Sequence, residues 1–335
     1  MKLLFIGGTG LISSACSELA LARGHELHIL NRSSSRKHPL PDKATLLQGD
    51  IHADETSLAS LLADQRFDAV VDWIAFTPND IERDIRLFRG NTNQFVFISS
   101  ASAYQKPPKH YLITEETPLE NPYWKYSQDK IACESILMKE YRENGFPVTI
   151  VRPSLTYGVS QIPFIGASWL HPYTVIDRMK RGQKVIVPGD GTSLWVLTWN
   201  GDFAKGLIGL LGNGKAIGEA FQITSDEVLS WDQIFLEAYQ ALGVEPNVIH
   251  IPSDLIVAHD PEKLGTLIGD KIHSAVFDNG KIKRFARDFV CEVKWAEGLR
   301  RALAWFEAHP EFQTIDHEMN AKWDRIISAF ERALP

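Results

Sequence analysis

The sequence predicts an α/β fold in which a doubly wound parallel sheet of about seven strands is joined to a smaller, mixed α/β lobe towards the C-terminus. Short apolar runs alternate with helical patterns over most of the first 225 residues, as in parallel sheets that helices cover on both faces. The first run, Leu3–Ile6, breaks into the glycine turn Gly7–Gly10 before a helical pattern starts. The chain of 335 residues is long enough for this domain and a second lobe.

The composition argues against several classes of protein. The formal net charge of −7 is not that of a protein built to hold nucleic acid or an anionic membrane. The three cysteines are far apart and odd in number, which favours free thiols in a reducing cytoplasm. No apolar run approaches the ~20 residues of a membrane span, and the short N-terminal run is no signal peptide. We therefore expect a cytoplasmic protein with no membrane span and no nucleic acid partner.

The apolar runs and the helix-end signals give the elements of the sheet domain in order. Gly24 suits the end of the first helix, and Pro78 suits the first turn of a later one. We expect helices at Leu11–Arg23, Glu55–Leu62, Pro78–Phe88 and Tyr126–Tyr141, and strands at Leu3–Ile6, Glu26–Leu30, Ala44–Gln48, Phe67–Trp73, Gln94–Ser99, Phe146–Arg152 and Ala220–Thr224.

The chain after residue 225 carries few chemical signals. Its histidines lack the spacing of metal ligands, so we expect no metal. Asp270, Lys271 and Asp278-Asn279 suit either a substrate lid or an ordinary surface loop. We expect helices at Trp231–Leu242, Asp254–Leu267 with a break near Asp260-Pro261, Ala296–Ala308 and Glu318–Leu334, and a strand at Val248–Ile251. The sheet domain would then comprise residues 1–158 and 196–225, and the smaller lobe residues 159–195 and 226–335.

The glycine turn after the first strand suits a dinucleotide-binding site. Gly7 and Gly10 allow backbone angles and a close approach to a pyrophosphate that other residues do not. The following helix directs its free N–H groups and the positive end of its dipole at that anion. Ser13 stands where many sequences with this motif carry a third glycine, and it is small enough for close packing of helix on strand.

The end of the second strand bears on the choice between the two nicotinamide cofactors. An acidic residue there accepts hydrogen bonds from the adenosine ribose, whereas an arginine pairs with a 2′-phosphate. The stretch Asn31–Lys37 has no acidic residue and contains Arg32, Arg36 and Lys37. We therefore expect NADP to be preferred over NAD; a solvated basic loop is the alternative interpretation.

Three further residues fall at strand ends that border such a groove. Asp50, after the third strand, suits a hydrogen bond to the adenine amino group, the N-cap of the helix at Glu55–Leu62, or both. Ala75, after the fourth strand, is small enough to let a cofactor lie close. Pro153 ends the sixth strand, where the chain should face the nicotinamide ring.

The stretch Tyr126-Ser127-Gln128-Asp129-Lys130 suggests acid–base chemistry. On a helix, Tyr126 and Lys130 share one face, and we expect the ammonium to lower the pKa of the phenol. Ser100, at the end of the fifth strand, would bind the substrate oxygen while Tyr126 transfers a proton and a nicotinamide carbon transfers hydride. Alone, such a pair is more often the surface of an amphipathic helix; its place after the glycine turn and the serine-rich strand end is what favours acid–base chemistry. Tyr123 is a competitor for Tyr126, and Ser99 and Ser102 are competitors for Ser100.

In combination these stretches resemble the extended short-chain dehydrogenase/reductase superfamily, in its NAD-dependent epimerase/dehydratase branch. The matching stretches are GGTGLIS at 7–13, Gly49-Asp50, the serines at 99–102, YSQDK at 126–130 with Glu134 beyond it, and VRPSLTYG at 151–158. Within the branch, VVDWIAF at 70–76 and PGDGTSLWVLTWN at 188–200 look similar to an atypical subgroup that includes chloroplast stem-loop-binding proteins.

The resemblance implies a Rossmann domain that binds NAD(P), and an epimerase, dehydratase or reductase acting on a sugar-like or small substrate. It gives the roles of a catalytic triad to Ser100, Tyr126 and Lys130, and it implies a homodimer through the helices that carry Phe88 and Tyr126. A dinucleotide-sensing or RNA-associated binding protein on the same fold is the alternative. The residues expected at the cofactor are Gly7, Thr9, Gly10, Leu11, Ile12, Asn31, Arg32, Asp50, Ile51, Ala75, Ser99, Tyr126, Lys130 and Pro153.

One departure from the family pattern bears on the substrate. Members that use sugar nucleotides usually place an arginine shortly after the Gly-Asp-Gly turn, where it holds the diphosphate, and here that position is Trp195. No charged residue occurs from Thr192 to Gly201, and tryptophan cannot replace a guanidinium. A nucleotide-diphosphate sugar is therefore less expected here. Trp195 and Trp199 suit either stacking on a substrate or packing in the core.

Overall fold

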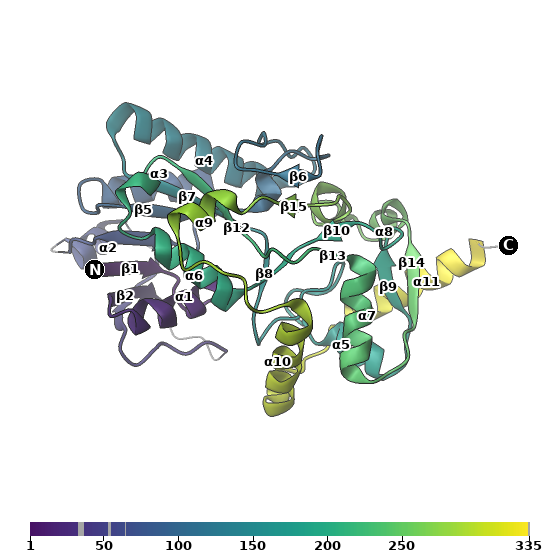
Figure 1. Cartoon of the computed structure of the whole chain (residues 1–335). Helices are drawn as coiled ribbons and strands as arrows, with labels where there is room; N and C mark the ends of the chain where they lie inside the picture. Colours follow the sequence, from purple (N-terminus) through teal and green to yellow (C-terminus); the bar gives the residue numbers. More distant parts are fainter. Residues whose placement is uncertain (33–36, 53–54, 64, 334–335) are drawn as a thin grey trace.

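The computed structural model describes residues 1–32, 37–52, 55–63 and 65–333. Its centre is a seven-stranded sheet in which every pair of neighbouring strands is parallel (Figure 1). The expected doubly wound α/β fold is therefore confirmed. In spatial order the strands are β12 (Ala220–Ile223), β7 (Val148–Pro153), β5 (Phe95–Ile98), β4 (Ala69–Asp72), β1 (Lys2–Ile6), β2 (Glu26–Asn31) and β3 (Thr45–Gln48).

Helices cover both faces of the sheet because its strands alternate apolar side chains between the two faces. In β1, Leu3 and Phe5 pack with α1 (Leu11–Ala22) and α6 (Asn200–Leu210). Leu4 and Ile6 face the other way. They pack with residues of α2 (Glu55–Leu62), α3 (Pro78–Phe88) and α4 (Lys125–Asn144).

The smaller lobe has a separate core rich in aromatic side chains, among them Trp231, Trp295 and Trp323. In Figure 1 this lobe lies on the right, and the sheet domain lies on the left. Its helices are α5 (Thr174–Lys180), α7 (Trp231–Leu242), α8 (Ser253–His259), α10 (Trp295–Ala308) and α11 (His317–Ala333), and its paired strands are β9 (Val185–Pro188) with β14 (Val248–Ile251) and β10 (Leu194–Trp195) with β13 (Leu229–Ser230).

Two short strand pairs connect distant parts of the chain. After Pro153 the chain forms β8 (Leu155–Tyr157), which pairs with β11 (Leu197–Trp199). Likewise β6 (Leu112–Ile113) pairs with β15 (Val276–Phe277). These pairings bring the segments after residues 110, 154, 194 and 270 to the junction of the sheet domain and the smaller lobe, near the carboxyl ends of the sheet strands.

The C-terminal portion follows the expectation only in part. The expected break near Asp260-Pro261 is confirmed, since α8 ends at His259, but the chain beyond it forms a 3₁₀ turn, Pro261–Lys263, and a π-helical turn, Leu267–Lys271, rather than more α-helix. The short helix α9 (Gly280–Phe285) returns to the sheet, where Ile282 packs in the same core as α6 and β12. Ala286 and Phe289, which follow this helix, pack in that core as well.

No helix in the described ranges is long and apolar enough to cross a membrane. The three cysteines are unpaired, and Cys16 and Cys133 are buried.

Candidate active site

The glycine turn has the conformation that the sequence predicts. Gly7 has φ +87°, and a Cβ atom there would lie 2.7 Å from Cγ2 of Ile74. The hydroxyl of Ser13 donates to the Gly7 carbonyl at 2.7 Å and accepts from the Gly10 N–H at 2.8 Å. Ser13 therefore closes the turn that leads into α1, whose first residues, Leu11 and Ile12, carry N–H groups without intrahelical partners.

The ends of β2 and β3 bring four of the expected cofactor residues to the same place. The Asn31 amide donates to the Thr9 hydroxyl at 2.7 Å. The Arg32 side chain is 77% exposed, and its guanidinium lies 3.9 Å from the Asp50 carboxylate. Residues 33–36, which include the expected basic residue Arg36, are outside the described ranges. Ile51, next to Asp50, is buried.

The expected N-cap role of Asp50 is wrong. Its carboxylate accepts the backbone N–H of His52 at 2.9 Å, and residues 51–52 form a turn rather than the start of a helix. The carboxylate therefore closes a local turn at the end of β3, next to Arg32.

The serines after β5 divide into two groups. Ser99 is buried, and its hydroxyl donates at 2.5 Å to Glu134, which also forms a buried ion pair of 2.6 Å with Arg152. Ser100 and Ser102 line a cavity, and their hydroxyls lie 2.9 Å apart. Ser99 therefore belongs to a structural network, and Ser100 and Ser102 are the serines that reach open space.

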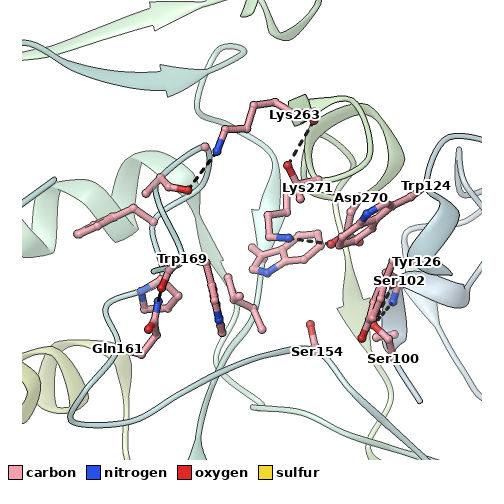
Figure 2. A pocket seen from close by; sticks show the side chains of 18 of the residues that line it. Ser100, Ser102, Trp124, Tyr126, Ser154, Gln161, Trp169, Lys263, Asp270 and Lys271 are labelled. Atoms are coloured by element: carbon pink, nitrogen blue, oxygen red, sulfur yellow. Dashed lines mark hydrogen bonds and ion pairs between the residues drawn. The ribbon is translucent and has the colours of Figure 1, made fainter. Parts of the chain in front are cut away.

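Tyr126 lies in the first turn of α4 and lines the same cavity as Ser100 (Figure 2). The competitor Tyr123 precedes the helix and is 38% exposed. Burial raises the pKa of Tyr126 above its ordinary value, a hydrogen bond with the Ser100 side chain lowers it in part, and the charge of Asp270 raises it further.

Lys130, one helical turn beyond Tyr126, is 1% exposed. Its ammonium donates to the carbonyl oxygens of Ala75 and Ile98, each at 2.7 Å, and lies 5.8 Å from the centre of the Tyr126 ring. The expectation that Lys130 lowers the pKa of Tyr126 is therefore wrong for this structure. The ammonium is held by two strand ends, and burial lowers its own pKa to about 8.

The ends of β4 and β7 complete the region around Lys130. Ala75 is fully buried, and its N–H donates to the Asp72 carboxylate at 2.8 Å. Pro153 is the last residue of β7 and is still opposite Ile223 of β12. The two residues that follow it, Ser154 and Leu155, line the cavity.

The cavity has a volume of about 540 Å³ and lies where the sheet domain meets the lobe. Its wall is rich in aromatic side chains, including Trp124, Trp169 and Trp195. Trp195 is 2% exposed and stacks on Trp231 at 5.7 Å between ring centres. Trp199 is not part of the wall, and it packs edge-on against Tyr157 at 5.3 Å.

The charged part of the wall comes from the segment after α8. Lys263, Asp270 and Lys271 all line the cavity (Figure 2). The sequence marked Asp270 and Lys271 as lid candidates but gave no signal for Lys263. Asp278 and Asn279, marked with them, instead bond to the backbone of Gly280 and Thr224. In the described part of the chain no cluster of His, Cys, Asp or Glu suits a metal ion.

The model of the NAD-dependent epimerase/dehydratase family matches residues 3–224. The chain therefore belongs to the NAD-dependent epimerase/dehydratase family. It is 26% identical to the chloroplast stem-loop binding protein of 41 kDa b of Arabidopsis thaliana, over 94% of this chain and 76% of that protein. It is 25% identical to a UDP-N-acetyl-alpha-D-glucosaminuronate decarboxylase of Bacillus cytotoxicus, over 91% of this chain and 97% of that enzyme.

Solved structures show the same fold at low sequence identity. A UDP-glucuronic acid 4-epimerase of Bacillus cereus, in complex with UDP-glucuronic acid and NAD, matches with a TM-score of 0.72 and 18% identity, over 92% of this chain and 99% of that one. A dTDP-glucose 4,6-dehydratase of Bacillus anthracis, in complex with NAD, matches with a TM-score of 0.73 and 19% identity, over 93% and 98% of the two chains.

Proposed function

We propose that the chain is an oxidoreductase of this family that works as an epimerase, a dehydratase or a reductase on an alcohol or carbonyl carbon of a sugar-like or small substrate. One observation carries the proposal: Tyr126 and Ser100 line the wall of one cavity, close enough for Ser100 to lower the pKa of the phenol, and buried Lys130 lies one helical turn further along α4. A tyrosine on a merely amphipathic surface would have no such cavity in front of it.

The strand ends beside this cavity suit a nicotinamide dinucleotide. The left-handed turn at Gly7 leaves no room for a side chain, and the helix that follows presents free N–H groups to a pyrophosphate. When bound, such a cofactor supplies the carbon that takes or returns a hydride. We propose NADP in preference to NAD, because the exposed guanidinium of Arg32 stands at the end of β2 with only a loose ion pair to Asp50.

The chain's own residues provide the proton transfer. The Ser100 hydroxyl is oriented by Ser102, which in turn accepts a hydrogen bond of 2.8 Å from Ser127. An oriented hydroxyl can hold the substrate oxygen at the phenol of Tyr126. As a neutral phenol, the form that its raised pKa favours, Tyr126 gives its proton to a carbonyl oxygen as hydride reaches the carbon; in the reverse direction its phenolate takes the proton from an alcohol. The buried ammonium of Lys130, bonded to the carbonyl oxygens of Ala75 and Ile98, holds the start of α4, and with it Tyr126, against the strand ends.

The purified protein provides the first test. We expect it to carry or to take up a nicotinamide cofactor, visible in its absorbance, and to change the oxidation state of that cofactor on adding members of a panel of sugars and small hydroxycarbonyl compounds. In Tyr126→Phe this change should slow by about 10²–10⁴-fold while cofactor affinity stays nearly unchanged. Tyr123→Phe is the matched control, since it removes an exposed hydroxyl two turns from Lys130.

A different outcome would favour a binding protein on the same fold. Tight, salt-dependent binding of RNA that Tyr126→Phe does not alter, together with no redox change with any compound, contradicts the proposed enzyme.

A further inference from the structure

We propose that Lys263 forms an anion subsite in the cavity, and that the substrate is a small molecule with a single compact anionic group, a carboxylate or a phosphate monoester. A nucleoside diphosphate sugar is not the expected ligand. This inference rests on the proposed function only in assigning the reacting end of the substrate to Tyr126.

Lys263 lies at the far side of the cavity from the reacting groups. It ends the 3₁₀ turn Pro261–Lys263, and its ammonium donates to the carbonyl oxygen of Ala167 at 3.3 Å. In Figure 2 it is seen across the cavity from Tyr126 and Ser100, with Lys271 and Asp270 between them. A ligand that places one end at Tyr126 therefore extends towards Lys263.

Two other cations near the cavity, Lys271 and Lys106, share one ion-pair partner, the carboxylate of Asp270. The Asp270 carboxylate lies 3.0 Å from the ammonium of Lys271 and 3.3 Å from that of Lys106. Although burial alone would raise it, these two ammonium groups bring the pKa of Asp270 below its ordinary value, so Asp270 is ionised. Together, Lys271 and Asp270 contribute no net charge to the wall.

Lys263 is the exception. Within residues 1–32, 37–52, 55–63 and 65–333, it forms no ion pair and has a carbonyl oxygen as its hydrogen-bond acceptor. The charged side chains of the wall, Lys263, Lys271 and Asp270, therefore sum to one positive charge, and the carboxylates that act on Lys263, Asp260 foremost, lie outside the wall. Burial lowers the pKa of Lys263, and a partner anion there gains more than at the surface because water screens the pair less.

A single net positive charge suits one small anion rather than a diphosphate. A diphosphate is best held by bidentate guanidinium groups, and the described wall contains no arginine. Trp195 stands where the diphosphate-binding arginine of sugar-nucleotide enzymes is expected, and it is packed against Trp231. The indole faces of Trp124 and Trp169 instead suit the flat or apolar body of a small ligand.

Binding of simple probes tests this subsite without any turnover. Benzyl alcohol, benzoate, phenyl phosphate and UDP are titrated into the cofactor-loaded protein, with quenching of tryptophan fluorescence as the signal. We expect benzoate or phenyl phosphate to bind more tightly than benzyl alcohol and than UDP. Lys263→Gln should weaken the anionic probe about tenfold or more and leave benzyl alcohol unchanged.

Lys322→Gln is the matched control, because Lys322 lies on the neighbouring helix α11 and pairs with Asp260 outside the wall. The proposal is overturned if no monoanion binds better than benzyl alcohol, if UDP binds better than both simple anions, or if Lys263→Gln and Lys322→Gln have equal effects. Tyr126→Phe should keep the binding of the anion. Loss of turnover in Tyr126→Phe therefore tests the proposed reaction, and loss of anion binding in Lys263→Gln tests the subsite.

Discussion

The ammonium of Lys130 donates a hydrogen bond of 2.7 Å to the carbonyl oxygen of Ala75 and thereby ties helix α4 to the end of β4. A second bond of the same length ties it to Ile98 at the end of β5. The helix that carries Tyr126 is thus fixed relative to the strand ends that border the cavity. The arrangement places a positive charge where only 1% of the side chain is exposed.

This burial predicts a particular dependence of stability on pH. The pKa of Lys130 is lowered from 10.5 to about 8 in the folded protein. Between these values the unfolded chain binds the proton more strongly, so stability rises with pH. Between pH 7 and 10, the unfolding free energy of the wild type should rise relative to that of Lys130→Met by about 2–3 kcal/mol. Urea unfolding of both proteins at the two pH values measures this, and parallel curves would contradict it.

The charge of Asp270 predicts a shift in the pH profile of catalysis. Because this carboxylate raises the pKa of Tyr126, Asp270→Asn should lower it and move the limb of the rate profile that reports phenol ionisation to lower pH. The loss of the carboxylate also frees the ammonium groups of Lys106 and Lys271, which act in the same direction. The phenolate absorbance of Asp270→Asn, with Tyr126→Phe as the baseline, gives the same pKa without turnover.

Glu262→Gln is the control for this shift. It removes an exposed carboxylate from the same segment without changing the cavity wall. An equal shift in both variants, or a shift of Asp270→Asn to higher pH, contradicts a direct effect of Asp270 on Tyr126.

Much of the fold and part of the site could be predicted from local sequence signals. The strand Leu3–Ile6 is wholly apolar because helices cover both faces of the sheet there, and the turn after it requires glycine at Gly7. The spacing of Tyr126 and Lys130 placed both correctly on one helix. Such features depend only on a few residues that are close together in the chain, so they can be predicted from the sequence.

The remainder depends on contacts between distant segments. Lys263 lies more than a hundred residues from Tyr126 in the chain, and it reaches the cavity only because the segment after α8 folds back over the strand ends. Whether the pKa of Tyr126 is raised or lowered depends on which groups the ammonium of Lys130 bonds to. The spacing of the two residues in the sequence does not determine those groups. Ser99 and Ser100 differ by one position, and that position decides between the Glu134 network and the cavity.

The glycine turn predicts a large difference between two glycine substitutions. Gly7→Ala combines a left-handed backbone angle with a Cβ atom 2.7 Å from Ile74. We expect it to lower the unfolding free energy by about 2 kcal/mol or more and to abolish cofactor binding. Gly24→Ala is the control, because Gly24 has φ +76° but no atom within 4 Å of the added Cβ. That variant should lose only about 1 kcal/mol and bind cofactor normally. If denaturant unfolding shows that Gly7→Ala and Gly24→Ala lose the same unfolding free energy, the close contact between Gly7 and Ile74 has no effect on stability.

The pair Arg32 and Asp50 predicts how the chain chooses between NADPH and NADH. The guanidinium is 77% exposed and lies 3.9 Å from the carboxylate, so it is available to a 2′-phosphate at little cost. Arg32→Ala should weaken the binding of NADPH by about five- to tenfold and change the affinity for NADH by no more than about twofold. Asp50→Asn should instead tighten the binding of NADPH, since it removes both the carboxylate that competes for Arg32 and a negative charge near the 2′-phosphate. The dissociation constants of NADPH and NADH for the wild type and the two variants test this prediction. If the NADPH constant is unchanged in Arg32→Ala, Arg32 does not contact the 2′-phosphate. If the wild type prefers NADH, Asp50 rather than Arg32 faces the ribose.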